Sequence, residues 1–110
     1  MTGDIPSRHG VHDWIRAGNV GPQRVDFLAG QPLLTDHVAA AGYRCALVGK
    51  WHLGYPPAFG PLRSGYDEFF GPMSGGVDYF THCASNQAHD LWEGEEEHAQ
   101  DGYLTDLISQ

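Results

Sequence analysis

The sequence predicts an α/β fold, and three neighbouring patterns support that class. Pro32 opens a segment with apolar side chains at helical spacing, and Gly42 ends it, which predicts a helix over residues 33–41. A short apolar run bounded by glycines follows at residues 43–49 and predicts a buried strand. A helix, a glycine and a strand in this order form half of a βαβ unit, so we expect a parallel sheet with helices on its faces.

The remaining elements are short and lie between loops. Residues 1–30 are punctuated by glycine and proline and predict an irregular segment, and a long loop follows the strand. Residues 67–70 predict a second short strand, and residues 75–82 predict a strand or a turn. Residues 102–110 predict the beginning of a helix, with Leu104, Leu107 and Ile108 on one face. We therefore expect a loop-rich, incomplete α/β sheet.

Length and charge limit the classes of function. The 110 residues suffice for one small domain, and the net charge of −8 argues against nucleic acid or an anionic membrane as a partner. The acidic run at residues 93–101 is interpreted as a solvated loop, because its consecutive carboxylates lack the spacing of a calcium-binding loop. No apolar run is long enough to span a membrane, and the N-terminus has no apolar signal segment.

Lys50 and His52 directly follow the strand predicted at residues 43–49. In open α/β sheets, ligands bind outside the carboxyl ends of the strands. Alternation along an extended backbone would send both side chains to one side and Trp51 to the other, into the core. A lysine and a histidine that meet at one place are suited to binding an anion, and the histidine can also transfer a proton. The alternative is that both side chains simply extend into water.

Several other residues have simpler interpretations. Arg44 precedes the strand and is expected to pair with a carboxylate there. Cys45 is interpreted as a small buried side chain, and the disulfide status of Cys45 and Cys83 stays open. The seven histidines show no zinc-binding spacing. The aromatic side chains outside the Lys50 region are interpreted as core or loop packing rather than as a ligand cage: Trp14, Tyr66, Phe69, Phe70 and Tyr79.

The run "GYRCALVGKWHLG" at residues 42–54 closely resembles the second signature of the sulfatase family. The segment "MTGDIPSRHGV" resembles the stretch that lies shortly after the sulfatase nucleophile motif. The segments that follow the signature resemble those of sulfatases in the same order: "GYDEFFG", "GGVDYFTH", "DLWE" and "GYLTDL". The resemblance covers nearly the whole chain and implies a partial alkaline-phosphatase-like doubly wound sheet, with residues 1–110 as part of a sulfatase N-terminal domain.

The resemblance implies specific roles for three residues. Lys50 matches the lysine that contacts the sulfate and the formylglycine hydroxyl, and His52 matches the histidine that bonds this hydroxyl and assists sulfate release. His82 lies in a loop that lines the approach to the pocket in sulfatases, so it is a further candidate for substrate contact, with packing or turn formation as the alternative. "DIPSR" at residues 4–8 is similar to the formylglycine motif, but the residues around it match the downstream segment, so Ser7 and Arg8 inherit no catalytic role.

The resemblance implies hydrolysis of sulfuric esters in the complete enzyme. Family sulfatases use calcium and formylglycine, and we expect no residue present here to supply either, so the chain alone is expected to be inactive. "GGVDYFTH" and "DLWE" favour the arylsulfatase B-like branch, whose substrates are often sulfated sugars. Family members are often lysosomal, secreted or periplasmic, and the compartment stays open here. The alternatives are a non-catalytic anion-binding module, a non-functional truncated product, or a phosphomonoesterase or phosphonate hydrolase of the same superfamily.

Overall fold

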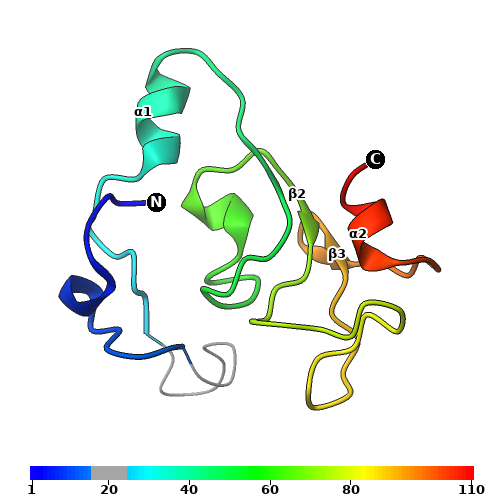
Figure 1. The fold of residues 1–110 in the computed structure, drawn as a ribbon. Coiled ribbons are helices and arrows are strands. Elements are labelled where there is room, and N and C mark those ends of the chain that lie inside the picture. Colours follow the sequence, from blue (N-terminus) through cyan, green and yellow to red (C-terminus); the bar gives the residue numbers. More distant parts are fainter. Residues whose placement is uncertain (16–24) are drawn as a thin grey trace.

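The computed structural model describes residues 1–15 and 25–110, which form a small mixed α/β structure (Figure 1). Part of the irregular segment expected over residues 1–30 thus lies outside the described residues. A sheet of four short strands has the order β1-β2-β3-β4. Its strands are β1 (Ala46–Val48), β2 (Glu68–Gly71), β3 (Trp92–Glu93) and β4 (Glu96–Glu97).

Only the first pair of strands is parallel. Leu47 of β1 is opposite Phe69 of β2, whereas β2–β3 and β3–β4 are antiparallel. The expected parallel pairing is therefore confirmed for β1 and β2 and is wrong for the other two pairs, because β2 continues through loops into a hairpin rather than through a helix. At the start of the first pair, Arg44 donates a hydrogen bond to Glu68 at 2.8 Å, which confirms the predicted ion pair.

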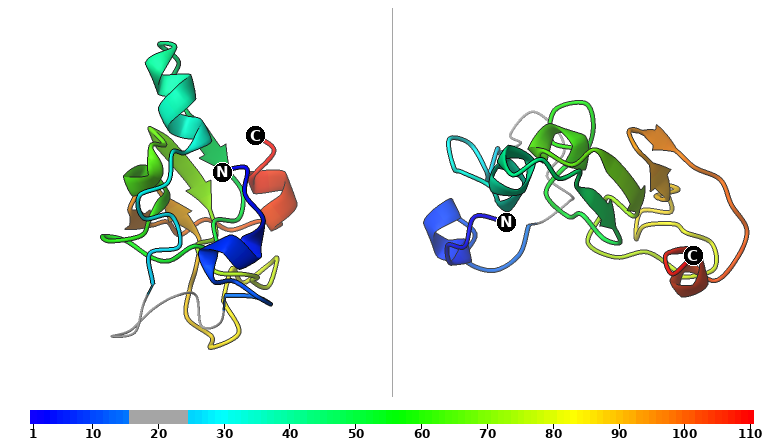
Figure 2. Two further views of the ribbon diagram at one scale, coloured as in Figure 1. Left: turned by 90° about the vertical axis from the view of Figure 1, so that its left-hand side faces the viewer. Right: turned by 90° about the horizontal axis from the view of Figure 1, so that it is seen from above.

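The helix predicted over residues 33–41 is present as α1 (Leu34–Ala40). It stands to one side of the sheet rather than on its face (Figures 1 and 2). Its buried residue is Thr35, whose hydroxyl donates to Ser64 O at 2.6 Å, in the 3-10 helix η3 (Pro61–Ser64). Leu34, one of the apolar side chains in the segment that follows Pro32, is 62% exposed. The helix is therefore fixed by a polar contact.

Because α1 does not cover the sheet, the prediction that β1 is a buried strand is wrong. Ala46 and Val48 are exposed, and only Leu47 packs against a core cluster. Cys45 is likewise half-buried rather than buried, and both Cys45 and Cys83 are free thiols.

The sequence indicated that the acidic run at residues 93–101 is a solvated loop, but part of this run forms two short strands. Glu93 pairs with Glu96 in the β3–β4 hairpin, which leaves Gly94 and Glu95 as a two-residue turn. Gly94 has a φ of 62°, and a glycine at the first turn position is typical of a tight hairpin. The carboxylates remain on the surface while the backbone forms a sheet edge.

Within the part of the chain that the structure describes, two small clusters form the core. One contains Trp51, Phe69 and Met73, and Tyr66 packs against it; the other contains Leu91, Leu104 and Leu107, with Phe70 and Ile108 beside it. Leu104 and Leu107 belong to α2 (Leu104–Leu107), which confirms the predicted C-terminal helix and its apolar face. Trp14 and Tyr79 are 61% and 51% exposed, so neither is a core residue, although Tyr79 packs against Tyr103.

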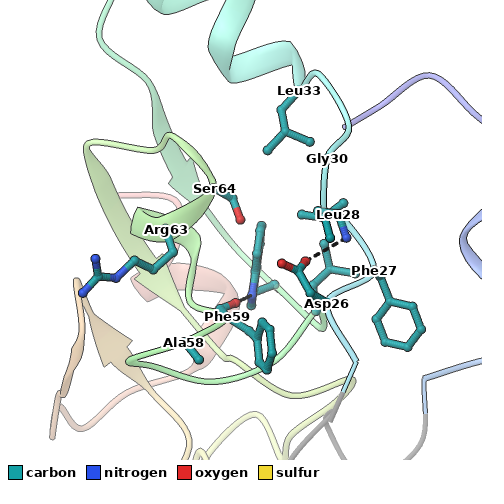
Figure 3. Close-up of a pocket in the computed structure, with 12 residues that line it drawn as sticks. Asp26, Phe27, Leu28, Gly30, Leu33, Ala58, Phe59, Arg63 and Ser64 are labelled. Carbon is teal, nitrogen blue, oxygen red and sulfur yellow. Dashed lines mark hydrogen bonds between the residues drawn. The ribbon is translucent and has the colours of Figure 1, made fainter.

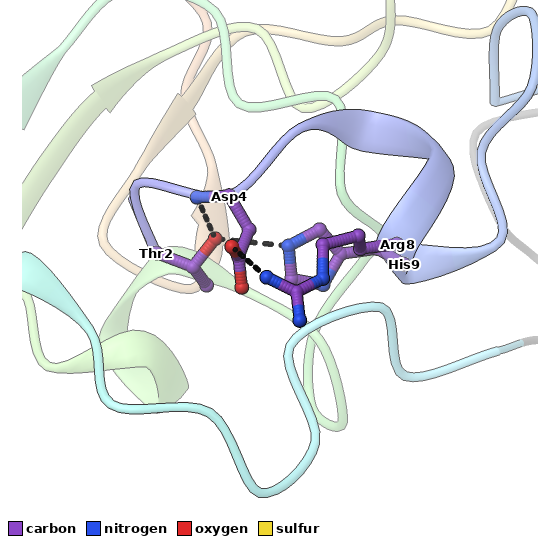
Figure 4. A network of polar contacts seen from close by, with 4 residues as sticks. All are labelled: Thr2, Asp4, Arg8 and His9. Atoms are coloured by element: carbon purple, nitrogen blue, oxygen red, sulfur yellow. Dashed lines mark hydrogen bonds and ion pairs between the residues drawn. The ribbon is translucent and has the colours of Figure 1, made fainter.

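The segment at residues 75–82 is a turn with one isolated bridge, between Val77 and Ala84. At the N-terminus, the 3-10 helix η1 (Pro6–His9) carries a local polar network (Figure 4). There Arg8 pairs with Asp4 at 2.9 Å, and the Thr2 hydroxyl lies 2.9 Å from His9 Nε2. Among the residues described, no helix combines the length and apolar character needed to cross a membrane.

Candidate functional site

The loop that carries Lys50 and His52 runs alongside the end of β2. The amides of Gly49 and Trp51 donate to Phe70 O and Pro72 O, at 2.8 and 3.0 Å. Trp51 is 6% exposed, and its indole Nε1 donates to Phe59 O at 2.7 Å. The prediction that Trp51 packs into the core is confirmed. With Trp51 anchored, its two neighbours are held away from the core.

Lys50 and His52 both reach the backbone of Gly75. Lys50 is exposed, and its Nζ donates to Gly75 O at 3.1 Å. A Cβ added to Gly75 would lie 2.7 Å from Cε1 and Nε2 of the His52 ring, so the ring rests against this glycine. The structure therefore brings the two side chains that the sequence singled out to the same turn. A glycine is required there because any side chain would displace the ring.

The backbone at His52 has a φ of 64°, in a region that non-glycine residues seldom adopt. Its amide donates to Met73 O at 2.9 Å, and its ring Nε2 lies 2.9 Å from Ile15 O. Because a carbonyl oxygen only accepts hydrogen bonds, Nε2 carries the proton in this contact. Nδ1 is then the ring nitrogen that accepts a proton. Strained backbone of this kind is concentrated at functional sites.

Sequence reasoning missed Asp90, which supports the turn that Lys50 and His52 contact. Asp90 is 1% exposed. Its carboxylate accepts hydrogen bonds from the amides of Met73 and Ser74 at 3.3 and 2.9 Å, and from the Trp92 indole at 2.8 Å. Burial, and then the negative charge of Asp90, raise the pKa of Tyr55 to about 12. The available signal was a carboxylate beside two large apolar residues, in "HDLWE".

His82 is in a different setting from Lys50 and His52. Its side chain is buried, with 2% exposure, and Nε2 lies 3.0 Å from Gly102 O. Its amide donates to Asp78 O at 3.0 Å, within the turn at residues 78–82. In the structure His82 thus fixes this turn to the segment before α2, and its contact with substrate stays a prediction.

A cavity of about 180 Å³ lies near the tryptophan but not at Lys50 (Figure 3). Its lining includes Leu28, Leu33, Trp51, Phe59 and Arg63, and neither Lys50 nor His52 is part of it. This cavity therefore does not coincide with the place where Lys50 and His52 meet, and their role as an anion site stays a prediction. Across residues 1–15 and 25–110, no three His, Cys, Asp or Glu side chains are grouped so that they could hold a metal ion.

Comparison with known proteins identifies relatives of the chain. No protein-family model matches it. The N-acetylgalactosamine-6-sulfatases of Canis lupus familiaris, Mus musculus and Homo sapiens are 37% identical to it over 67 residues, or 57% of this chain. The chain is related to the sulfatases. It spans 13% of the length of these relatives.

Two solved structures resemble the fold of this sulfatase relative. Ps i-CgsB in complex with k-i-k-neocarrahexaose matches with a TM-score of 0.59 and 25% identity, over 83% of this chain and 22% of the other. A second structure, of Ps i-CgsB, matches with a TM-score of 0.62 and 23% identity, over 94% of this chain and 28% of the other. The loop-rich α/β arrangement of the sulfatase relative is thus also found in solved structures.

Proposed function

We propose that Lys50 and His52 form part of a sulfate-binding site and that the whole protein hydrolyses sulfuric esters. The observation that carries this proposal is their convergence on Gly75, with Lys50 Nζ on the carbonyl oxygen and the His52 ring against the same glycine. A sulfate oxygen would replace Gly75 O as the acceptor for the exposed ammonium group. A cation placed before the reaction stabilises negative charge as it develops on the ester, without reorganisation.

His52 supplies the second function of the site. Its half-buried ring lies against Gly75, and its Nε2–H donates to Ile15 O before an anion binds. In this proposal a sulfate oxygen takes the place of Ile15 O as the acceptor for Nε2–H, so that His52 donates a hydrogen bond to the bound anion. The strained backbone at His52 supports the proposal, because such strain persists only where the surrounding structure imposes it.

We propose a sulfated sugar as the substrate class and an alkaline-phosphatase-like doubly wound sheet as the complete fold. The curated relatives bear the name N-acetylgalactosamine-6-sulfatase, and one solved structure of similar fold holds a neocarrahexaose. Both names refer to sugars. The relatives also favour sulfuric esters over the phosphate and phosphonate esters that Lys50 and His52 alone would accommodate.

Calcium and formylglycine belong to this proposal only through the family. The described residues offer no group of three ligating side chains. They therefore do not fit a calcium ion by themselves, and we derive no step through either group. What Lys50 and His52 contribute is charge and hydrogen-bond donors.

The test is binding of inorganic sulfate to the 110-residue chain, followed by NMR of the His52 ring and the Gly75 amide. Lys50→Ala should weaken binding about tenfold or more, because hydrogen bonds to charged groups contribute about 1.5–3 kcal/mol. His52→Ala should weaken it as well. Arg8→Ala is the matched control, since Arg8 is a cation paired with Asp4 in the N-terminal network.

Three outcomes separate the proposal from its alternatives. Equal binding by the parent chain and both variants would overturn the proposal. Tighter binding of phosphate than of sulfate would favour the phosphate-ester class. Turnover of an aryl sulfate is measured in the same samples, and turnover by the chain alone would contradict the expectation that it is inactive by itself.

A further inference from the structure

We propose that Asp90 is a positioning residue that holds Lys50 and His52 in place through the Met73–Gly75 turn. The inference rests on the proposed function, since that function defines what the two side chains are positioned for. Asp90 itself touches neither of them in the contacts described above. Its effect passes through the backbone of the turn.

The first step is that the carboxylate is itself fixed. It is 1% exposed, and its Oδ1 accepts from the Met73 amide and from the Trp92 indole, at 3.3 and 2.8 Å. Its Oδ2 accepts from the Ser74 amide at 2.9 Å. The Asp90 amide donates to His82 O at 2.8 Å. A buried charge with several donors is held in one orientation, because any other orientation leaves it unpaired.

The second step is that the same turn carries the candidate site. Met73 uses its amide for Asp90 and its carbonyl oxygen for the His52 amide, at 2.9 Å. Gly75 follows directly and accepts from Lys50 Nζ while it supports the His52 ring. The backbone of three consecutive residues thus connects the buried carboxylate to both candidate groups.

The third step is that an amide cannot replace this carboxylate. In Asp90→Asn one oxygen becomes an NH₂ group, which only donates. Either orientation of the amide then places NH₂ against a backbone N–H, because donors face both carboxylate oxygens. The unpaired donor pushes the turn away, and the positions of Lys50 and His52 change with it.

The first arm of the experiment does not depend on sulfate. NMR spectra of the 110-residue chain are compared for the parent, Asp90→Asn and the control Asp101→Asn, which removes an exposed carboxylate of the same type. Asp90→Asn should shift the amides of Ser74 and Gly75 and the ring signals of His52, and Asp101→Asn should not. Unchanged His52 and Gly75 signals in folded Asp90→Asn would overturn the proposal.

The second arm measures the affinity for inorganic sulfate. Asp90→Asn should weaken binding about tenfold, comparable with Lys50→Ala. In a Lys50→Ala background, Asp90→Asn should reduce the sulfate affinity much less, because the ammonium group that Asp90 positions is already absent. An equal loss in both backgrounds would show a merely structural role and overturn the proposal. If the parent binds no sulfate but the first arm succeeds, the proposed function fails while Asp90 still positions the two side chains.

A second variant covers the case in which Asp90→Asn does not fold. Trp92→Phe keeps the ring in the core but removes the indole donor to Asp90 Oδ1. It should shift the same Ser74, Gly75 and His52 signals by a smaller amount. Shifts confined to the neighbourhood of Trp92 would overturn the proposal.

Discussion

At the scale of single residues, Gly75 controls the geometry of the candidate site. Its missing side chain leaves the space that the His52 ring occupies, and an added Cβ would lie 2.7 Å from two ring atoms. We expect Gly75→Ala to displace the ring and to weaken sulfate binding about tenfold, while the chain stays folded. Sulfate titration and thermal unfolding are measured side by side.

The neighbouring glycine offers a matched control for this experiment. A Cβ added at Gly76 would meet nothing within 4 Å. Gly76→Ala should therefore leave both the His52 signals and the sulfate affinity as they are in the parent. If the two alanine variants behave alike, the contact between Gly75 and His52 does not shape the site.

The same residues show what the sequence could and could not predict. The burial of Trp51 and the pairing of Arg44 with a carboxylate follow from patterns that span only a few positions, although the sequence did not identify Glu68 as the partner. The contact between His52 and Gly75 joins residues that are far apart in the chain, and it depends on the alignment of residues 49–52 with the end of β2. Local periodicity does not contain that alignment, so it could not identify Gly75, and for Asp90 it offered only a carboxylate beside two large apolar residues.

At the scale of elements, the Asp78 carboxylate accepts several hydrogen bonds within the turn at residues 78–82. Asp78 Oδ1 accepts from the amides of Phe80 and Thr81 at 3.0 and 2.8 Å, and from the Thr81 hydroxyl at 3.1 Å. The hydrogen bonds from Thr81 N and then Phe80 N lower the pKa of Asp78 below its usual 3.8. These hydrogen bonds stabilise the charged carboxylate, so Asp78 binds a proton less tightly in the folded turn than in the unfolded chain.

This pKa shift fixes the direction of a pH effect. The contribution of Asp78 to stability is present above the unfolded pKa of 3.8 and is lost as the pH falls through the lowered value. Acidification should therefore shift the Phe80 and Thr81 amides and speed their hydrogen exchange. Asp78→Asn should abolish this pH-dependent step. If Asp78→Asn shows a pH-dependent change of equal size, another titrating group causes it.

Elements differed in how well the sequence predicted them. The helices α1 and α2 and the strand β2 lie where apolar spacing and flanking glycines indicated. The β3–β4 hairpin was missed because four glutamates around Gly94 resemble a solvated loop. The charge of a segment indicates only that its side chains face water. The hairpin depends instead on backbone hydrogen bonds and on the φ of 62° at Gly94.

At the scale of the whole molecule, stability depends on two separate small clusters rather than one core. The cluster of Trp51, Phe69 and Met73 includes two residues that adjoin the candidate site, and the cluster of Leu91, Leu104 and Leu107 joins α2 to the strand hairpin. Asp90 and Leu91 are adjacent in sequence, so the polar support of the site and the second cluster share one backbone segment. Loss of packing at Leu91 should therefore reach the site.

Substitutions at two leucines measure how much the second cluster contributes to the stability of the fold. Leu91 is completely buried, and Leu34 is 62% exposed on α1. Leu91→Ala should lower the free energy of unfolding by about 2–5 kcal/mol, the usual cost of a cavity in a core. Leu34→Ala should change it by less than about 0.5 kcal/mol. Since domains of this size are stable by only about 5–15 kcal/mol, the first loss is a large share of the total. Denaturant unfolding of both variants measures the difference, and equal midpoints would show that the second cluster does not stabilise the fold.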